Sequence, residues 1–453
     1  MKKGLSYLIV FCLIFTVIGC SSSNNESANN KAANDQATNN GGANQGAVDT
    51  EEPVNIKFYT YKTKRDEEPY VIAVNAFNES HPNIQVEYVD LVQNNDTVEF
   101  LNKLDVLMAG GEAVDVFHTG NFEQLIERAA RGVVAPLDEF YANENIDPKE
   151  EYVLNPMYDG KTYGVIANSS QWMVVFNKDH LDDAGLPLPE MGWTWDDFRE
   201  YAKKLTTPDH FGTYFHTWGE YPNVIAYTEL PHPQLKEDLT LNFDDPSFKY
   251  FFELRRAMEE EDKSVEPYAD VLASDYHVLQ QFFAGKASML ATASFVVNAG
   301  TLLDRFPHDF QMVYAPVPRS SESAEMGLTN VSGSFLGVGA KSKHQEAAYT
   351  FARWMTTEGA QYLQDIPGWK KVDGGALLEQ FYGDKQDLID LESLSSTLFD
   401  PRVKMNSAGI AVPYGSELKT IVENGFSQFM LNHTTFEEAQ QFMISEGQKL
   451  IKK

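Results

Sequence analysis

Residues 54–89 read VNIKFYTYKTKRDEEPYVIAVNAFNESHPNIQVEYV, and this stretch decides the fold class. Its first six residues, Val54 to Tyr59, alternate in polarity, which is typical of a half-buried β-strand. A helical pattern follows from Glu67 to Glu79 and stops at His81-Pro82, because the residue before a proline disfavours the helical conformation. Ile84 to Val89 predicts a second strand. A strand, a helix and a strand in close succession predict a layered α/β fold.

The same alternation continues along the chain. Asp96 begins a helix that Gly110-Gly111 ends, and Val114 to Phe117 is a short buried strand. Later helices have clear start signals, which predict where they begin. These signals are Thr194 with Asp197 as a capping box, Trp193 with Phe198 as a hydrophobic staple, Asp245-Pro246, and Ser342 with Gln345.

The N-terminus carries an export signal. Lys2 and Lys3 precede an apolar run from Leu5 to Ile18, which is short for a bilayer span and suits a signal peptide. The run closes with Val17-Ile18-Gly19-Cys20, which resembles the lipobox of bacterial lipoproteins. We therefore expect residues 1–19 to be a signal peptide and Cys20 to carry lipid on the extracytoplasmic face of the cell membrane. An uncleaved anchor helix with an incidental cysteine is the alternative.

Residues 20–52 are expected to form a disordered polar tether. From Ser21 to about Thr50 the chain consists mostly of Ser, Asn, Ala, Gly and Gln, so it has little apolar surface to bury. The body that follows is long enough for two or three domains.

Composition excludes several function classes. The sequence has two cysteines, Cys12 and Cys20, so the body holds no thiol for a disulfide, a cysteine nucleophile or a cysteine zinc site. The formal net charge of −30 argues against nucleic acid or an anionic lipid surface as partner. We expect no cofactor and no metal.

Several ordered motifs run through the body of the chain. The motifs are Val114–Phe117, GVVAPLD at 132–138, DGKTYG at 159–164, VVFNK at 174–178, Ala184–Leu186 before Thr194-Trp195, FFAGKASM at 282–289, APVP at 315–318, Gly333 and Glu346–Ala348. In their order and spacing they resemble those of the extracellular solute-binding proteins of sugar ABC importers, the group that contains the maltose-binding proteins.

The resemblance implies a two-lobed α/β fold of the periplasmic-binding-protein kind, with hinge crossings and a ligand cleft between the lobes. The implied lobes are 53–166 plus 316–368 and 167–315 plus 369–453. The implied crossings lie near Ile166–Ala167, Ala315–Val317 and Pro367–Lys371. The protein would act as a monomer that captures a carbohydrate, an oligosaccharide, and delivers it to the permease subunits of an ABC importer.

The sequence departs from the pattern of that family at two places, one in the first hinge and one that bears on the identity of the sugar. Ile166-Ala167 stands where the family usually has a proline, so the first hinge can differ in detail. Phe295 stands near the position of an expected tryptophan, which weakens any assignment to a particular sugar.

Aromatic residues are the first candidates for a sugar site, because sugars present C–H faces that stack on flat rings. We predict Trp172, Trp218, Phe295, Trp369 and Tyr414 as ligand-binding residues. Trp172 follows the first crossing, Trp369 stands at the third, and Tyr414 lies where similar proteins place a stacking ring. Packing in the core is the alternative for Trp172 and Trp218.

Polar candidates follow strands that should end at the cleft. Tyr61 and Lys62 follow the first strand, and Asn121 follows the buried strand at Val114–Phe117. Asn121 could bond a sugar hydroxyl or cap a helix. Ser332 precedes an apolar strand near the second crossing and completes the predicted site.

The chain is predicted not to be an enzyme. It lacks the His-Glu-x-x-His, Gly-x-Ser-x-Gly and phosphate-loop motifs. Asp196-Asp197 and Asp244-Asp245 could suggest the carboxylate pair of an exported glycosidase, but adjacent residues of a helix do not face one site and both pairs fit helix caps. The open alternatives are such a glycosidase, a binding protein for a non-sugar solute, and a sensor or adhesin.

Overall fold

The computed structural model describes residues 52–93, 95–274, 278–406 and 409–452. The predicted signal peptide, the tether and Cys20 lie outside the described residues.

The strand–helix–strand unit predicted from residues 54–89 is confirmed. β1 (Val54–Thr60) pairs in parallel with β2 (Ile84–Asp90), and α1 (Pro69–Ser80) connects them. Val71, Val74 and Phe77 of α1 are buried, as its helical pattern requires.

Capping residues also determine where the next helix begins and ends. The Asp96 carboxylate accepts from the Glu99 amide at 2.8 Å and caps α2 (Thr97–Gly110). Gly111 ends the helix with φ +90°, a conformation that favours glycine. β3 (Val116–Thr119) then pairs in parallel with β1.

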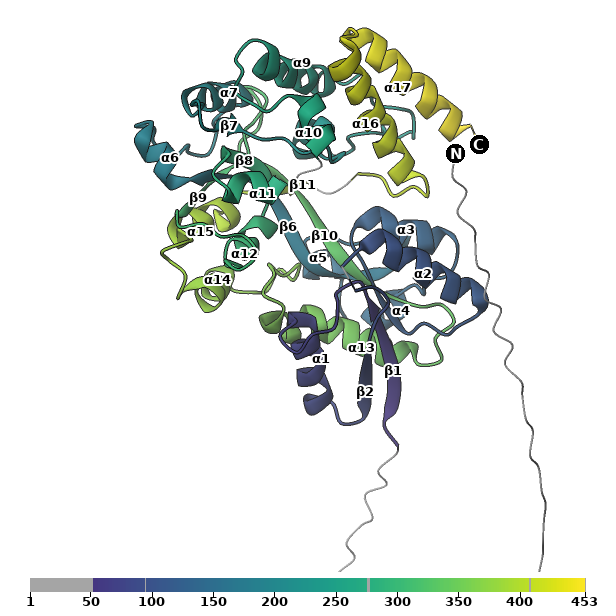
Figure 1. Ribbon diagram of the computed structural model, residues 1–453. Helices are drawn as coiled ribbons and strands as arrows, with labels where there is room; N and C mark the ends of the chain where they lie inside the picture. The colour runs from purple at the N-terminus through teal and green to yellow at the C-terminus, as the bar shows by residue number, and fades with distance from the viewer. Residues whose placement is uncertain (1–51, 94, 275–277, 407–408, 453) are drawn as a thin grey trace, which may run out of the picture. The chain divides into compact units, whose positions relative to one another are not determined.

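Two long strands connect the halves of the main sheet, whose order is β2-β1-β3-β10-β6-β8-β7. β6 (Gly164–Asn177) and β10 (Leu328–Val338) pair antiparallel with each other. Figure 1 shows both running from the elements around β1 to those around β8. The strands beyond are β7 (Phe211–Thr213), β8 (Ala287–Ala293), β9 (Met312–Pro316) on β6 and β11 (Lys404–Asn406) on β10, with β4 (Met157–Tyr158) and β5 (Lys161–Thr162) forming a separate hairpin.

The helices cover both parts of this sheet. The helices after α2 are α3 (Phe122–Ala130), α4 (Asp138–Asn143), α5 (Pro148–Glu151), α6 (Lys178–Asp183), α7 (Trp195–Lys204), α8 (Val224–Glu229), α9 (Pro246–Glu260), α10 (Tyr268–Ser274), α11 (Val278–Phe283), α12 (Phe295–Ala299), α13 (Gln345–Thr356), α14 (Gly374–Tyr382), α15 (Leu391–Phe399), α16 (Gly415–Asn432) and α17 (Phe436–Ile451). Two short 3-10 helices, η1 (Tyr221–Asn223) and η2 (Glu358–Tyr362), complete the described helices.

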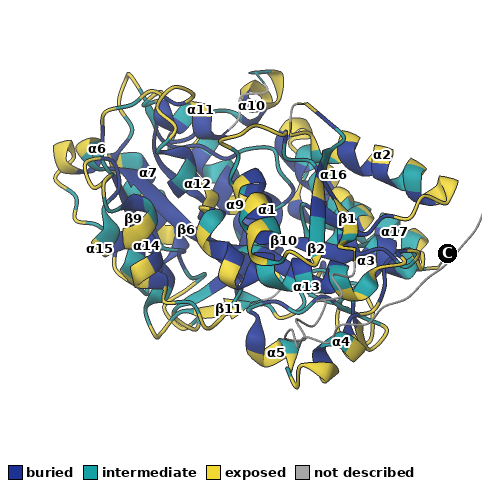
Figure 2. Ribbon diagram, turned by 90° about the horizontal axis from the view of Figure 1, so that it is seen from below, coloured by how far each residue is buried: buried dark blue, intermediate teal, exposed yellow. Residues whose placement is uncertain are grey.

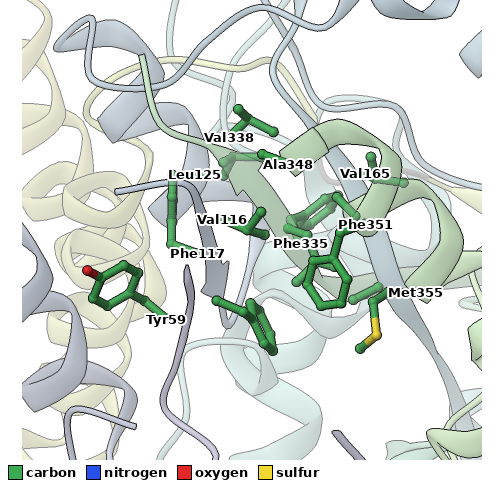
Figure 3. Packing of buried hydrophobic residues seen from close by; sticks show 14 of the residues in the cluster. Tyr59, Val116, Phe117, Leu125, Val165, Phe335, Val338, Ala348, Phe351 and Met355 are labelled. Atoms are coloured by element: carbon green, nitrogen blue, oxygen red, sulfur yellow. The ribbon is translucent and has the colours of Figure 1, made fainter. Parts of the chain in front are cut away.

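Separate hydrophobic cores define two lobes. One core joins β1, β3, β10 and α13, and Figure 3 shows Val116, Phe335 and Phe351 meeting in it. The elements around this core are here called the first lobe. Two further cores, around Trp195 and around Tyr314, belong to what is here called the second lobe. Figure 2 shows β6 and β10 largely buried along their length.

The chain passes between the cores along β6 and returns along β10. Val165 lies in the first core and Val174 in the second. Val317 still packs in the second core, whereas Val331 packs in the first. The chain therefore crosses back to the first lobe within β10, later than the expected crossing near Ala315–Val317. The β9 strand keeps residues 312–316 in the second lobe because it pairs with the outer half of β6.

A third connection packs against β6. The Ser169 amide donates to the Ile366 carbonyl at 2.7 Å, and the Val153 amide donates to the Gly368 carbonyl at 2.9 Å. A β-carbon at Gly368 would lie 2.4 Å from Ile166 Cγ2, so this close approach requires glycine.

Two of the three predicted helix starts after residue 190 are confirmed. Thr194 and Asp197 form the capping box of α7, and the rings of Trp193 and Phe198 lie 6.0 Å apart. Asp245 caps α9 through the Ser247 amide.

The start predicted at Ser342 is wrong, because α13 begins at Gln345 without a side-chain cap. The Ser342 hydroxyl instead donates to the buried Asp115 carboxylate at 2.6 Å, and a bond to a charged acceptor is the stronger one.

Candidate functional site

A cavity of about 880 Å³ is lined by both lobes. Lys62, Glu68 and Asn95 line it from the first lobe, and Asn298 and Lys385 line it from the second. The chain between the lobes also contributes to the lining, at Gln364 and Asp365. Cavities between lobes are where binding proteins hold small molecules, so this region is the candidate site.

Tyr61 and Lys62 lie together at the end of β1, as predicted. The ammonium of Lys62 is 5.6 Å from the ring centre of Tyr61 and 5.7 Å from that of Tyr70. The Tyr61 ring stacks on His118 with 4.7 Å between centres. Burial alone would lower the pKa of Lys62, but Tyr61, Asp365 and Glu68 outweigh it and hold that pKa above its ordinary value. Lys62 is therefore a charged group at the cavity wall.

The side chain of Asn121 caps a helix. Its carbonyl oxygen accepts from the Gln124 amide at 3.0 Å at the start of α3. The Gly120 amide donates to the Gln124 side chain at 2.8 Å, which closes the same turn. This is the capping alternative that the sequence left open. A sugar contact by Asn121 stays a prediction.

Three of the predicted aromatic residues belong to one connected group. The ring of Trp218 lies 6.0 Å from that of Phe295 and 6.4 Å from that of Tyr221. Tyr221 in turn lies 5.5 Å from Trp172. Phe295 is one helical turn before Asn298, a residue of the cavity wall, so α12 connects the group to the cavity wall.

The side chains of this aromatic group differ in exposure. Phe295 is 36 % exposed and Trp218 is half-buried, whereas Trp172 is 7 % exposed and Tyr221 1 %. The carbonyl of Trp172 accepts from the Thr329 hydroxyl at 2.7 Å, within the paired strands. Trp218 and Phe295 are thus the rings placed to meet a solute.

Sequence reasoning missed Tyr221 and His216. The ring centre of His216 lies 4.5 Å from that of Trp218. The Tyr221 ring stacks on the same Trp218 ring, with 6.4 Å between centres. Both residues stand within three positions of Trp218, and that clustering of rings was the available signal.

Ser332 and Tyr414 lie on different elements. Ser332 is half-buried in β10 opposite Ser170, and its hydroxyl donates to the Ser170 carbonyl at 3.5 Å. Tyr414 directly precedes α16 and packs against the second-lobe core. Their contact with a solute stays a prediction.

Trp369 is tied to the first lobe. Its indole N–H donates to the Glu151 carboxylate at 2.7 Å. The same carboxylate is 2.8 Å from Arg353 and 2.6 Å from Lys371, and its side chain is 5 % exposed. Burial would raise the pKa of Glu151, but bonds from Lys371, Trp369 and Arg353 lower it below its usual value. Trp369 thus fixes the third connection, and a ligand role for it is untested.

The acidic pairs considered for a glycosidase are engaged in structural contacts. Asp197 completes the capping box of α7, and Asp196 accepts from the Tyr250 hydroxyl at 2.9 Å. Asp245 caps α9, and Asp244 pairs with Lys236 at 3.0 Å.

Among the described residues, no group of three or more His, Cys, Asp or Glu side chains is arranged to hold a metal ion. No helix in that part of the chain is long and apolar enough to cross a membrane.

The family model of bacterial extracellular solute-binding proteins matches residues 61–362, more than half of the chain. An uncharacterized lipoprotein of Streptomyces antibioticus is 23 % identical over 321 residues, which is 64 % of this chain and 67 % of that protein.

Solved structures show the same fold. The sugar transporter of Rhizobium etli in an open conformation has a TM-score of 0.72 and 22 % identity, over 87 % of this chain and 99 % of its own. The ABC substrate-binding protein of Listeria monocytogenes in complex with cycloalternan has a TM-score of 0.71 and 22 % identity, over 88 % and 99 %. These likenesses confirm the predicted two-lobed α/β fold.

Proposed function

This chain belongs to the family of bacterial extracellular solute-binding proteins, and from that membership we propose that it captures a carbohydrate between its lobes. The proposed ligand is an oligosaccharide, which the protein delivers to an ABC-type importer. The protein binds its ligand without turning it over. The observation that carries this proposal is the ring pair of half-buried Trp218 and exposed Phe295, one helical turn from Asn298 in the wall of a cavity of about 880 Å³ lined by both lobes.

The chemistry of the cavity suits a sugar. The neighbouring rings of Trp218 and Phe295 offer apolar faces for sugar C–H groups, and Lys62, Asn95 and Asn298 of the cavity wall offer donors and acceptors for hydroxyls. Two rings 6.0 Å apart and inclined by 61° offer two neighbouring surfaces, which favours a ligand of more than one sugar unit. A sugar transporter and a cycloalternan complex among the similar structures support the same ligand class.

The remaining parts of the proposal concern the lobes and the anchor. We place the lobe boundaries near Ile166–Ala167, within β10, and near Pro367–Lys371, and we expect closure by hinge motion at these connections. Cys20 is the proposed site of lipidation, which the lipoprotein relative supports. The anchored protein would work as a monomer at the extracytoplasmic face of the membrane.

A thermal-shift screen tests the ligand class. A ligand that binds only the folded protein raises its stability, by about 2.7 kcal/mol at a hundredfold excess over Kd. The panel would hold glucose, maltotriose, mannotriose and cycloalternan, with glycerophosphocholine and an amino-acid mixture as non-sugar arms. We expect an upward shift of the melting temperature with at least one oligosaccharide and none with the non-sugar arms.

The opposite pattern, a shift with a non-sugar arm alone, would reassign the ligand class. Chromatography of the oligosaccharides after incubation checks for turnover, and the appearance of shorter products would replace binding by a glycosidase activity.

A further inference from the structure

The two lobes meet at α3 of the first lobe and α16 of the second. The Ser416 hydroxyl donates to the Glu127 carboxylate at 2.5 Å. A β-carbon at Gly415 would lie 3.1 Å from Glu123 Cγ, so the absence of a side chain there lets the two helices approach closely. This contact joins residues almost 300 positions apart in sequence. It can form only when the two lobes are close together.

The same helix holds the loop that carries Trp218. One turn after Gly415, the ammonium of Lys419 donates to the Glu220 carboxylate at 2.7 Å. A β-carbon at Gly219 would lie 1.9 Å from Glu423 Oε1 and 2.8 Å from Lys419 Cγ, so the loop backbone rests on both of these α16 side chains. The side-chain amide of Asn223 donates to the Gly219 carbonyl at 2.6 Å and closes the turn from the other side. Lys419, together with Glu423, therefore holds the residues on the C-terminal side of Trp218.

The charge of Lys419 also acts on carboxylates of both lobes. Its side chain is 18 % exposed. Burial would lower the pKa of Lys419, but Glu123 of the first lobe, Tyr227 and Glu220 raise it well above its ordinary value. Glu423, on the next turn of α16, has a raised pKa because of burial and of Glu220. Without the ammonium, closure would bring Glu123 towards uncompensated carboxylates of the second lobe.

We propose that Lys419 is a positioning residue that couples lobe closure to the placement of the Trp218 loop. It holds the loop through Glu220 and Gly219 and attracts Glu123 across the cleft. This proposal rests on the proposed function, since closure matters only if a solute is captured. An ordinary structural lysine of the second lobe would stabilise the loop without responding to a charge on the first lobe.

The proposal predicts that one substitution has opposite effects in two backgrounds. In the parent protein Glu123→Gln removes an attraction and opens the lobes. In the Lys419→Met background the same substitution removes a repulsion and closes them. Such a reversal of sign requires direct coupling between the two residues.

Interlobe distances from pulsed electron paramagnetic resonance test this coupling without any sugar. The full chain would carry Cys12→Ser and Cys20→Ser, with spin labels at Val106→Cys in the first lobe and Leu272→Cys in the second. Both label positions are exposed, at 72 % and 44 %. We expect Lys419→Met to lower the ratio of closed to open forms about fivefold, and Glu123→Gln to raise that ratio again only when it is combined with Lys419→Met.

Control variants separate coupling from simple damage. Lys419→Arg keeps the charge and should keep the parent distance distribution. Lys449→Met removes an exposed lysine paired with Glu446 on α17, and it should leave the distribution unchanged. A distribution indifferent to Lys419→Met, or a Glu123→Gln effect of the same sign in both backgrounds, would overturn the proposal.

If Lys419→Met does not fold, Glu123→Gln alone remains decisive, because an unchanged distribution in that variant would also overturn it. Failure of sugar binding in the thermal-shift screen would leave these distances untouched, so the two proposals fail separately.

Discussion

Trp218 is the residue on which the proposed site depends most. Its ring lies 6.4 Å or less from those of Phe295, Tyr221 and His216, and it is more exposed than the buried Tyr221 beneath it. We expect Trp218→Ala to weaken oligosaccharide binding about tenfold, since a stacked ring contributes on the order of 1 kcal/mol beyond its buried area. Titration calorimetry with the strongest ligand of the thermal-shift panel measures this loss.

Phe140→Ala is the matched control for that substitution. Phe140 is also half-buried and stacks on Tyr349 at 5.1 Å, but it belongs to α4 of the first lobe. It should lower the melting temperature and leave the affinity unchanged. Equal affinity losses in the two variants would remove Trp218 from the site.

A stacked histidine pair lies in the second lobe. The rings of His180 and His210 lie 3.9 Å apart, and their Nδ1 atoms both bond the Ser288 hydroxyl, at 3.0 and 2.9 Å. One hydroxyl can donate to one ring and accept from the other, so the arrangement suits two neutral imidazoles. Burial and the neighbouring His210 lower the pKa of His180, against the opposing effect of Asp179 and Asp183.

Stability should therefore fall on acidification. Because the folded pKa of His180 is depressed, the unfolded chain binds its proton first as the pH falls. The contribution is full above about pH 6.5 and is lost below it. Buried His118, whose pKa is also lowered by burial, adds to the same trend. We expect His210→Phe, which keeps a stacked ring but removes the like charge, to flatten the decline in melting temperature between pH 7 and pH 5.

His118 is present in the parent protein and in the His210→Phe variant. The difference between their pH profiles therefore reports on the His180–His210 pair alone. Parallel profiles would mean that the two histidines do not interact electrostatically.

Among the elements, α5 and the third connection share one buried carboxylate, beside the bonds that Lys370 donates to the carbonyls of Lys149 and Glu151. Glu151 ends α5 and binds Trp369, Arg353 and Lys371. We expect Glu151→Gln to lower the free energy of unfolding by about 3 kcal/mol, because it leaves the Arg353 cation without its buried partner. Urea denaturation measures the loss.

Glu144→Gln is the comparison for this substitution. Glu144 binds the same Arg353 at 3.2 Å, but its side chain is 40 % exposed, so its removal should cost less than about 1 kcal/mol. A loss for Glu151→Gln no larger than that would show that the carboxylate does not hold the third connection.

The sequence predicted elements well where the deciding interactions are local. The Asp96 cap, the Thr194–Asp197 capping box and the strand at Val54 each depend on neighbours within a few residues. Ser342 does not cap α13: its hydroxyl donates to Asp115, which is 227 positions away in sequence, and accepts from the His344 amide just before the helix. The return crossing was expected too early for a similar reason, since the pairing of β9 with β6 is a contact between distant segments.

The candidate site follows the same rule. Tyr61 and Lys62 could be placed because a strand end at the cleft is a local feature. The contact of Trp218 with Phe295 joins a loop to a helix 77 positions later, and no periodicity in the sequence encodes it. Lys419 escaped notice altogether, because its partners Glu220 and Glu123 meet it only when two lobes and three segments are assembled.

At the scale of the whole molecule, anchoring and capture should be separable. The binding cleft lies within residues 54–451, whereas Cys20 lies outside the described residues. A Cys20→Ala chain should therefore bind its oligosaccharide with unchanged affinity in solution. It should fail to support uptake at limiting sugar, because a protein free to diffuse away cannot keep a high local concentration at the importer.

Radiolabelled sugar uptake by cells, compared at limiting and at saturating concentration, measures this difference. Trp218→Ala is the complementary variant, since it should remain anchored and lose uptake through weaker binding. The two defects would respond differently to added sugar. Saturating sugar should restore the transport of the Trp218 variant, because mass action refills a weakened site, but it should restore that of the Cys20 variant much less, because sugar does not return the protein to the membrane. If uptake by the Cys20 variant were normal at limiting sugar, the lipid would have no part in delivery.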